Sequence, residues 1–215
     1  MAEEFNNVLA YYEDVFQECD MIPAVGKITV RPEAIAKSHK PNDLCRCCHI
    51  IGSEDLNEIY IKVTKKTILD TIEFIKNPPS QRFRANMTAV LNVQPIFPQD
   101  KVTNELSEMS QQGKFDSIKT RIKIKVFDFN DEFDNSQIFE YVMRKLAALG
   151  LSENHEIITY GNQIKYIKVQ VESFEDIKKI AEINGVKNVD FFQEYSLPTC
   201  LLYTSDAADD RISVD

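Results

Sequence analysis

The sequence predicts an α+β protein with two antiparallel sheets, because two periodicities recur in a fixed order. Residues 121–129 (RIKIKVFDF) alternate apolar and polar side chains, which is typical of a half-buried strand. Residues 137–150 and 173–185 repeat apolar side chains every three to four positions, as amphipathic helices do. The order strand, helix, strand, strand, helix, strand is found in residues 25–96 and again in residues 120–198.

The second of these regions begins with the strand at 121–129, followed by a helix that we expect to be capped by Ser136 and ended by Gly150. The apolar stripe of this helix comprises Phe139, Val142, Leu146 and Leu149. The dipeptide Gly161-Asn162 predicts a hairpin turn between two further strands.

The last helix and strand of this region have the clearest boundary signals. Ser173 and Asp176 have the spacing of a capping box at the start of the helix. Gly185 stands just past its end, where glycine is common. A final strand is expected over residues 186–195.

The first region has weaker signals. An amphipathic helix in residues 1–24 is expected to cap the protein, face a partner, or dock as part of the core. Strands are predicted at 26–32, 43–52, 57–64 and 84–96, with a short helix at 33–39 and a longer one at 64–77. Residues 97–119 are polar and show no period, so they are expected to form a linker or an exposed insertion.

Two successive βαββαβ units correspond to the split βαβ, or ferredoxin-like, arrangement, a four-stranded antiparallel sheet with two helices on one face. The expected organisation is an N-terminal helical segment (1–24), a first unit (25–96), a linker (97–119), a second unit (120–198) and a tail (199–215).

Composition narrows the function classes. The chain has 215 residues, of which 43% are hydrophobic and 27% charged, as in ordinary globular proteins. No apolar run approaches the ~20 residues of a membrane helix, and the acidic N-terminus is unlike a secretory signal, so a cytoplasmic location is expected. A net charge of −9 argues against nucleic-acid binding. A solvated strand face is the best interpretation of Tyr166, Lys165 and Lys168, because the glycines of an RNA-binding signature are missing.

The sequence motifs give little support for a catalytic or metal site. The three histidines, His39, His49 and His155, lie in no motif that would expose a nucleophile, and no glycine-rich phosphate loop is present. The acidic run at 127–135 lacks the glycine and distal glutamate of a calcium loop. We therefore expect no catalytic residue, no metal ligand and no cofactor.

The stretch CRCCH is the one that suggests a metal. Cys45, Cys47, Cys48 and His49 are nearly consecutive and have no second ligand pair further on, so packing is the favoured interpretation and redox sensitivity an alternative.

The C-terminal part of the chain, YIKVQVESFEDIKKIAEINGVKNVDFFQEYSLP, resembles the end of the propeptide, or inhibitor-like domain, that precedes subtilisin-like serine peptidase domains. Gly185, Val186 and Val189 match that family's Gly-Val-x-x-Val start of the last strand. Residues 26–47 and 50–63 resemble the long N-terminal region of intracellular bacterial members, so that the similarity covers most of residues 21–198.

The resemblance implies a role and a partner. In that family the unit packs its sheet on the peptidase domain, assists folding, and places its extended end in the substrate cleft by strand addition. The matching segment here would consist of Gln193, Glu194, Tyr195, Ser196, Leu197 and Pro198. The partner would be a subtilisin-like catalytic domain downstream in cis. The Asp, His and Ser motifs of the peptidase are absent from this sequence, so the chain as given is expected to be no enzyme, whereas its parent would be a serine endopeptidase.

Two alternatives remain open. The first is a ligand-binding regulatory module of the same topology, although no glycine-bearing loop before a first helix supports it. The second is an interaction scaffold without a ligand.

The tail is expected to have a different origin from the rest. Residues 200–210, CLLYTSDAADD, resemble the translation of a transposon-type sequencing-library adapter, and RISVD fits its continuation. We interpret residues 199–215 as a non-native or disordered tail of a metagenomic fragment. Cys200 is therefore not considered a reactive thiol, and the three aspartates Asp206, Asp209 and Asp210 are not considered a metal site.

Overall fold

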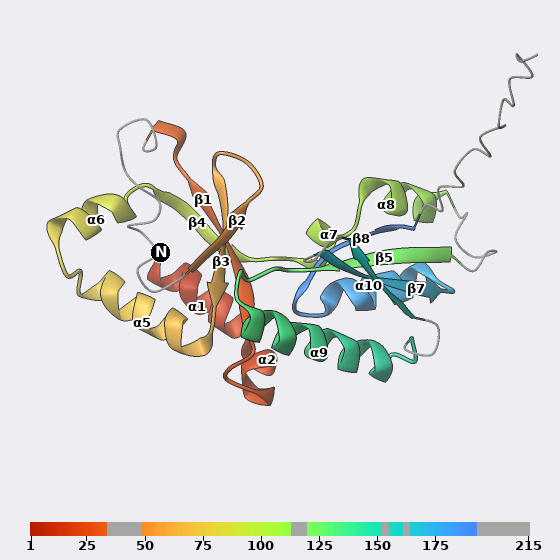
Figure 1. The fold of residues 1–215 in the computed structure, drawn as a ribbon. Helices are drawn as coiled ribbons and strands as arrows, with labels where there is room; N and C mark the ends of the chain where they lie inside the picture. The colour runs from red at the N-terminus through yellow and green to blue at the C-terminus, as the bar shows by residue number, and fades with distance from the viewer. Residues whose placement is uncertain (34–48, 113–119, 152–154, 161–163, 193–215) are drawn as a thin grey trace, which may run out of the picture.

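The structure is a computed structural model that describes residues 1–33, 49–112, 120–151, 155–160 and 164–192 (Figure 1). It contains two four-stranded antiparallel sheets, each packed with helices, consistent with two tandem ferredoxin-like units. Their strand orders are β2-β3-β1-β4 and β6-β7-β5-β8. The two orders are equivalent when strands are numbered within each unit, which confirms the predicted fold class.

The first sheet consists of β1 (Ala24–Val30), β2 (His49–Ser53), β3 (Glu58–Val63) and β4 (Val90–Pro95). Ile28 in the central strand β1 lies opposite Ile59 of β3 and Val93 of β4. Alternation places these side chains on one buried face, while Lys27 and Tyr60 lie on the other. Residues 34–39 of the helix expected at 33–39 and the cysteines at 45–48 lie outside the described residues, and His49 opens β2.

The N-terminal segment forms part of the first core. Its helices are α1 (Ala2–Tyr11) and α2 (Glu13–Glu18), and α1 packs against β4 and against α5 (Lys65–Lys76). The side chains buried there are Phe5, Val8, Tyr12 and Phe16. The Tyr12 hydroxyl donates to the Val25 carbonyl at 2.8 Å and accepts from the Ile96 backbone N–H at 3.3 Å. Of the roles expected for this segment, the structure therefore shows a docked core helix.

The strand predicted at 84–96 is wrong in its first half. Residues Gln81–Met87 form α6, and β4 begins only at Val90. The Ser80 side chain caps this helix by accepting from the Phe83 backbone N–H at 3.1 Å, and Phe83 is buried. The turn that ends α5 is therefore followed directly by a second helix, α6, which the sequence pattern did not predict.

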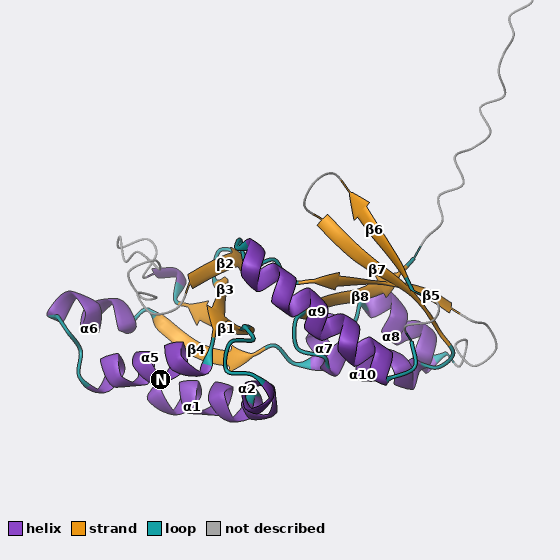
Figure 2. Cartoon of the chain, turned by 60° about the horizontal axis from the view of Figure 1, so that its bottom comes forward, coloured by secondary structure: helices purple, strands orange, loops and turns teal. Residues whose placement is uncertain are grey.

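The second sheet consists of β5 (Thr120–Val126), β6 (Glu156–Tyr160), β7 (Ile164–Val171) and β8 (Val186–Phe191). Its helices are α9 (Glu132–Ala148) and α10 (Phe174–Glu182), which Figure 2 shows on the same side of the sheet. The largest fully buried side chains of this unit are Ile122, Ile124, Ile138, Leu146, Ile167, Ile177 and Ile180.

Two helix N-caps were predicted in the second unit, of which one is confirmed and one is wrong. Ser173 and Asp176 form the predicted capping box, which is confirmed. Ser136 does not cap α9, because the helix begins four residues earlier. Its N-cap is Asp131, whose carboxylate accepts from the backbone N–H groups of Phe133 and Asp134, both at 3.0 Å. The exposed fraction of Leu149 is 39%, so this residue is not part of the buried stripe.

Residues 97–119 were expected to be an exposed linker, and their described part is instead helical. It contains α7 (Pro98–Lys101) and α8 (Asn104–Gln111). α7 packs against α10 and β8, and the Leu106 side chain of α8 is fully buried. We call residues 98–111 the edge segment, because they lie along the β8 edge of the second sheet.

Candidate functional site

The residues that carry the Gly-Val-x-x-Val pattern lie at the turn into β8. Gly185 has a φ of +89°, and a Cβ at this position would overlap the side chain of Ile138 in α9. Its carbonyl accepts from the Phe127 backbone N–H at 2.9 Å. Val186 and Val189 are fully buried. The pattern therefore describes a tight turn that holds the last strand against α9.

The segment predicted to enter a cleft, residues 193–198, lies outside the described residues. The structure describes the chain up to Phe192, whose backbone N–H donates to the Arg121 carbonyl at 3.0 Å. The predicted segment therefore follows directly from the β8 end of the sheet. His39, Cys45, Cys47 and Cys48 also lie outside the described residues.

The outer edge of β8 is paired with the edge segment. Val102 forms a parallel bridge with Val189, and the Thr103 backbone N–H donates to the Val189 carbonyl at 3.2 Å. The Asp190 carboxylate accepts from the Thr103 hydroxyl at 3.3 Å and from the Phe191 backbone N–H at 2.8 Å. A strand edge protected in this way does not readily pair with another chain at Val189.

Lys101 anchors the edge segment from within the protein. Its exposed fraction is 4%, and its Nζ donates to the Ile183 carbonyl at 3.1 Å, at the C-terminal end of α10. Burial lowers the pKa of Lys101 from its ordinary value of 10.5 to about 8, against the smaller opposing effects of Asp100 and Glu182.

The two units share a junction with both apolar and polar contacts. Ile22, Val25 and Ile96 of the first unit belong to the same buried cluster as the core of the second. The Asn184 side-chain amide, itself buried, donates to the Pro23 carbonyl at 3.0 Å. These contacts hold the turn before β8 against the start of the first sheet.

Ion pairs extend the junction to its rim. Lys62 of β3 pairs with Asp134 of α9, whose side chain is only 10% exposed. Glu18 of α2 pairs with Arg144 at 3.1 Å and also with Lys145, both on α9. All three pairs join residues that are far apart in sequence, so they help fix the orientation of the two sheets.

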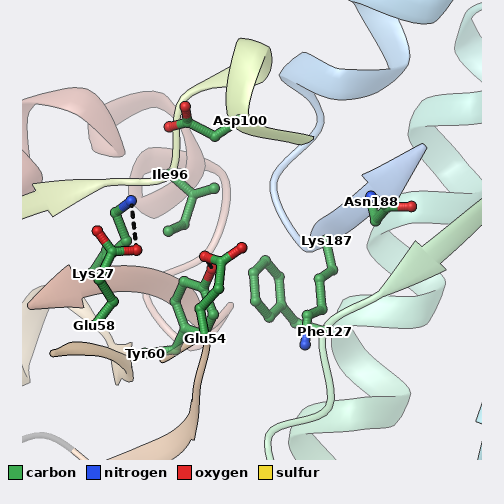
Figure 3. A pocket seen from close by; sticks show the side chains of 9 residues that line it. All are labelled: Lys27, Glu54, Glu58, Tyr60, Ile96, Asp100, Phe127, Lys187 and Asn188. Atoms are coloured by element: carbon green, nitrogen blue, oxygen red, sulfur yellow. Dashed lines mark hydrogen bonds and ion pairs between the residues drawn. The ribbon is translucent and has the colours of Figure 1, made fainter. Parts of the chain in front are cut away.

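A cavity of about 320 Å³ opens at this junction. Figure 3 shows its nine lining residues, which come from β1, β3, the turn before β3, the segment from β4 to α7, the end of β5, and β8. Sequence reasoning missed this site because its residues are spread over several short segments that only the fold brings together. None of them is a defining residue of a motif, since Lys187 and Asn188 occupy only the two variable positions of the Gly-Val-x-x-Val pattern.

The first-unit wall of the cavity is acidic but partly neutralised. Glu58 pairs with Lys27 at 3.3 Å. The Tyr60 hydroxyl donates to the Glu54 carboxylate. The pKa of Tyr60 is raised by burial and, to a smaller extent, by this hydrogen bond to Glu54, so the phenol stays protonated at neutral pH. Asp100 of α7 also lines the cavity; this residue is exposed, and its charge favours the protonated form of the neighbouring Lys101.

The second-unit wall is aromatic and cationic. The Phe127 ring meets Tyr60 edge to face, with ring centroids 5.7 Å apart. The Lys187 Nζ lies 5.8 Å from the Tyr60 centroid and 5.6 Å from that of Phe127. Burial, and secondarily Lys125, lower the pKa of Lys187. No described residue accepts a hydrogen bond from this ammonium.

The lysines on the open face of the second sheet have partners within the chain. Lys123 pairs with Asp190 at 3.0 Å, and Lys168 pairs with Glu156 at 3.1 Å and lies over the Phe192 ring. Lys125 lies 6.0 Å from the Tyr166 ring centroid. Much of the positive charge on this face is therefore compensated locally.

The described parts of the chain contain no group of three or more His, Cys, Asp or Glu side chains arranged to hold a metal ion. None of their helices combines the length and apolar character that crossing a bilayer requires. No protein-family model matches the chain, and no match is found among curated proteins.

Proposed function

We propose that residues 1–198 are the non-catalytic N-terminal region of a subtilisin-like serine peptidase, and that the second unit docks on a catalytic domain encoded downstream in cis. In this role the unit assists folding of that domain, inhibits it, or regulates it. The location of the assembly would be the cytoplasm.

The observation that carries the proposal is the position of β8. It is the last strand of a βαββαβ unit, lies at an edge of its sheet, and leads directly into residues 193–198. A segment that leaves the end of an edge strand can extend away from the sheet into a neighbouring groove, where backbone hydrogen bonds would supply affinity. The half-exposed side chains on the open face, such as Lys123 and Tyr166, leave that face available for docking.

The pairing of the edge segment with β8 limits which parts of the unit could contact a catalytic domain. Because Val102 and Thr103 already pair with Val189, strand addition on β8 itself would have to displace them. The proposal therefore assigns the cleft contact to residues 193–198 and the docking contact to the open face of the sheet.

The test begins with the gene beyond the codon for Thr199. We expect it to encode the Asp, His and Ser motifs of a subtilisin-like domain. That domain, refolded with residues 1–199, should regain its fold faster or show reduced activity compared with refolding alone. A different downstream enzyme, or a peptidase whose refolding and activity are both unchanged, would contradict the proposal.

A matched pair of truncations separates the two contacts. A chain ending at Phe192 should lose inhibition but still bind the catalytic domain, whereas a chain ending at Thr199 should behave as the longer one does. The chain by itself should show no peptidase activity, and its labelling by a serine-directed fluorophosphonate would speak against the assignment.

A further inference from the structure

The two sheets have four edge strands, β2 and β4 in the first and β6 and β8 in the second. Three of these strands carry a register shift that leaves one residue without an opposite partner. The unmatched residues are Ile51 in β2, Leu91 in β4 and Lys187 in β8. Such bulges twist a strand and interrupt its hydrogen-bonding edge, which hinders pairing with another chain. The edge of β8 is covered in addition by Val102 and Thr103 of the edge segment.

The fourth edge strand, β6, lacks comparable protection from any described residue. All five of its residues, Glu156–Tyr160, pair with β7 in one unbroken register. Among the described residues, no backbone hydrogen bond joins β6 to an element other than β7. Figure 2 shows β6 as the outermost strand of the second sheet. Because alternate residues of an edge strand direct their N–H and C=O groups away from the sheet, β6 presents a regular row of donors and acceptors.

A side chain of β6 adds apolar surface to this edge. Ile157 lies opposite the fully buried Ile167 of β7, so it belongs to the face of the sheet that α9 and α10 cover. The exposed fraction of Ile157 is nevertheless 46%. A further strand added to β6 would therefore satisfy its backbone groups and also cover an apolar side chain at the rim of the core.

We propose that β6 pairs antiparallel with β6 of a second copy of this chain, about a two-fold axis at Ile158. The two copies of the second sheet would then form one continuous sheet with both helix layers on the same face. In this register Ile157 lies opposite Thr159 of the second copy, and Glu156 lies opposite its Tyr160. All five residues of the strand are paired, and each Ile157 is covered by the other copy.

The sequence of β6 suits pairing with itself. Its one charged residue, Glu156, lies at the start of the strand, so antiparallel pairing keeps the two glutamates at opposite ends. Pairing about a two-fold axis uses the same surface on both chains. Because the β8 edge of each sheet is already covered, the assembly closes at a dimer and does not extend into a fibre. β6 and β8 lie at opposite edges of the sheet, so the inference goes beyond the docking role and does not depend on it.

The test is sedimentation analysis of the full 215-residue chain over a range of concentrations, in the presence of a reducing agent. Because one pair of five-residue strands makes a small interface, we expect a dissociation constant on the order of 10–100 µM. Hydrogen exchange at the backbone amides of β6 should slow as the dimer forms. A chain that stays monomeric at about 1 mM, roughly ten times the weakest of these values, would overturn the proposal.

Two double variants with the same substituted positions test the register. Ile157→Lys combined with Thr159→Lys places like charges opposite each other across the two-fold axis, and it should weaken the dimer by at least about tenfold. Ile157→Lys combined with Thr159→Glu places opposite charges there and should retain the dimer. Leu91→Lys is the control, because Leu91 has a similar exposed fraction of 49% but lies on the bulged strand β4.

Circular dichroism and thermal melting establish that each variant is folded. The expected result is a dimer in the native sequence, in the variant with lysine and glutamate and in Leu91→Lys, and a monomer in the variant with two lysines. A dimer that persists with two lysines shows that another surface is used. Equal loss in both double variants, or loss in Leu91→Lys, would likewise contradict antiparallel pairing through β6.

Discussion

Replacing Lys101 with methionine tests the claim that a charged group is buried beneath the edge segment. Methionine has a similar length, fills the same space and carries no charge. The Ile183 carbonyl that accepts from Lys101 also accepts from the Val186 backbone N–H at 3.3 Å, so the variant leaves it with a partner. The substitution therefore removes mainly the charge and one hydrogen bond.

The magnitude follows from the pKa of Lys101. In the unfolded chain the ammonium loses its proton near the ordinary value of 10.5, whereas in the folded protein it does so near 8. Between these values the unfolded state binds more protons, so the free energy of unfolding of the native sequence rises with pH. The separation of about 2.5 pH units (10.5 minus 8) corresponds to about 3 kcal/mol, gained between about pH 8 and pH 10.5.

The assay compares urea unfolding of the two proteins at intervals from pH 7 to pH 10.5, followed by circular dichroism in the presence of a reducing agent. The variant lacks the rise, so its stability relative to the native sequence should fall by about 3 kcal/mol across this range. This change does not depend on how much packing or hydrogen bonding the substitution alters, since those effects are constant with pH. Lys66→Met, at an exposed position of α5, is the control. Parallel stability curves for Lys101→Met and the native sequence would refute the reasoning.

Three further predictions concern stability and can be checked by urea unfolding. Gly185→Ala should lower the free energy of unfolding by about 2–4 kcal/mol, because alanine at a φ of +89° is strained and its Cβ would overlap Ile138; an effect below 1 kcal/mol would show that this turn adapts. Asp134→Ala should cost about 1–3 kcal/mol by leaving the Lys62 ammonium half-buried, and a double-mutant cycle with Lys62→Met should show coupling between the two, whereas additive effects would contradict the pairing. Ser173→Ala should cost about 1 kcal/mol through loss of the α10 cap, with Ser173→Asp retaining most of the stability if the capping interaction is the cause.

Local patterns were sufficient to predict most of the second unit. The alternation in residues 121–126 defines β5 because one face of that strand is fully buried and the other is solvated. The capping box of α10 needs only two side chains three residues apart, so it is visible in the sequence. Gly185 was also recognisable, although its close approach to α9 was not.

The sequence-based predictions were wrong where two local signals compete, or where tertiary contacts determine the secondary structure. Asp131 and Ser136 are both good capping residues, and α9 begins at the earlier one because Asp131 accepts two backbone hydrogen bonds in the first turn. α8 has few apolar positions, and its packing along β8 with Leu106 buried is a long-range contact that a periodicity search does not see. The cleft-binding segment, residues 193–198, stays a prediction.

The junction explains why the candidate cavity could not have been inferred from either unit. Each ferredoxin-like unit satisfies its own sheet and helix hydrogen bonds, but Asn184 and Lys101 are buried polar groups that need acceptors from other elements. Asn184 finds one in the first unit, at Pro23. Separating the units would expose Val25 and Ile96 and leave the Asn184 amide to water. The arrangement that keeps these groups paired also brings the lining residues of both units around the cavity, so the cavity is a consequence of how the units are joined.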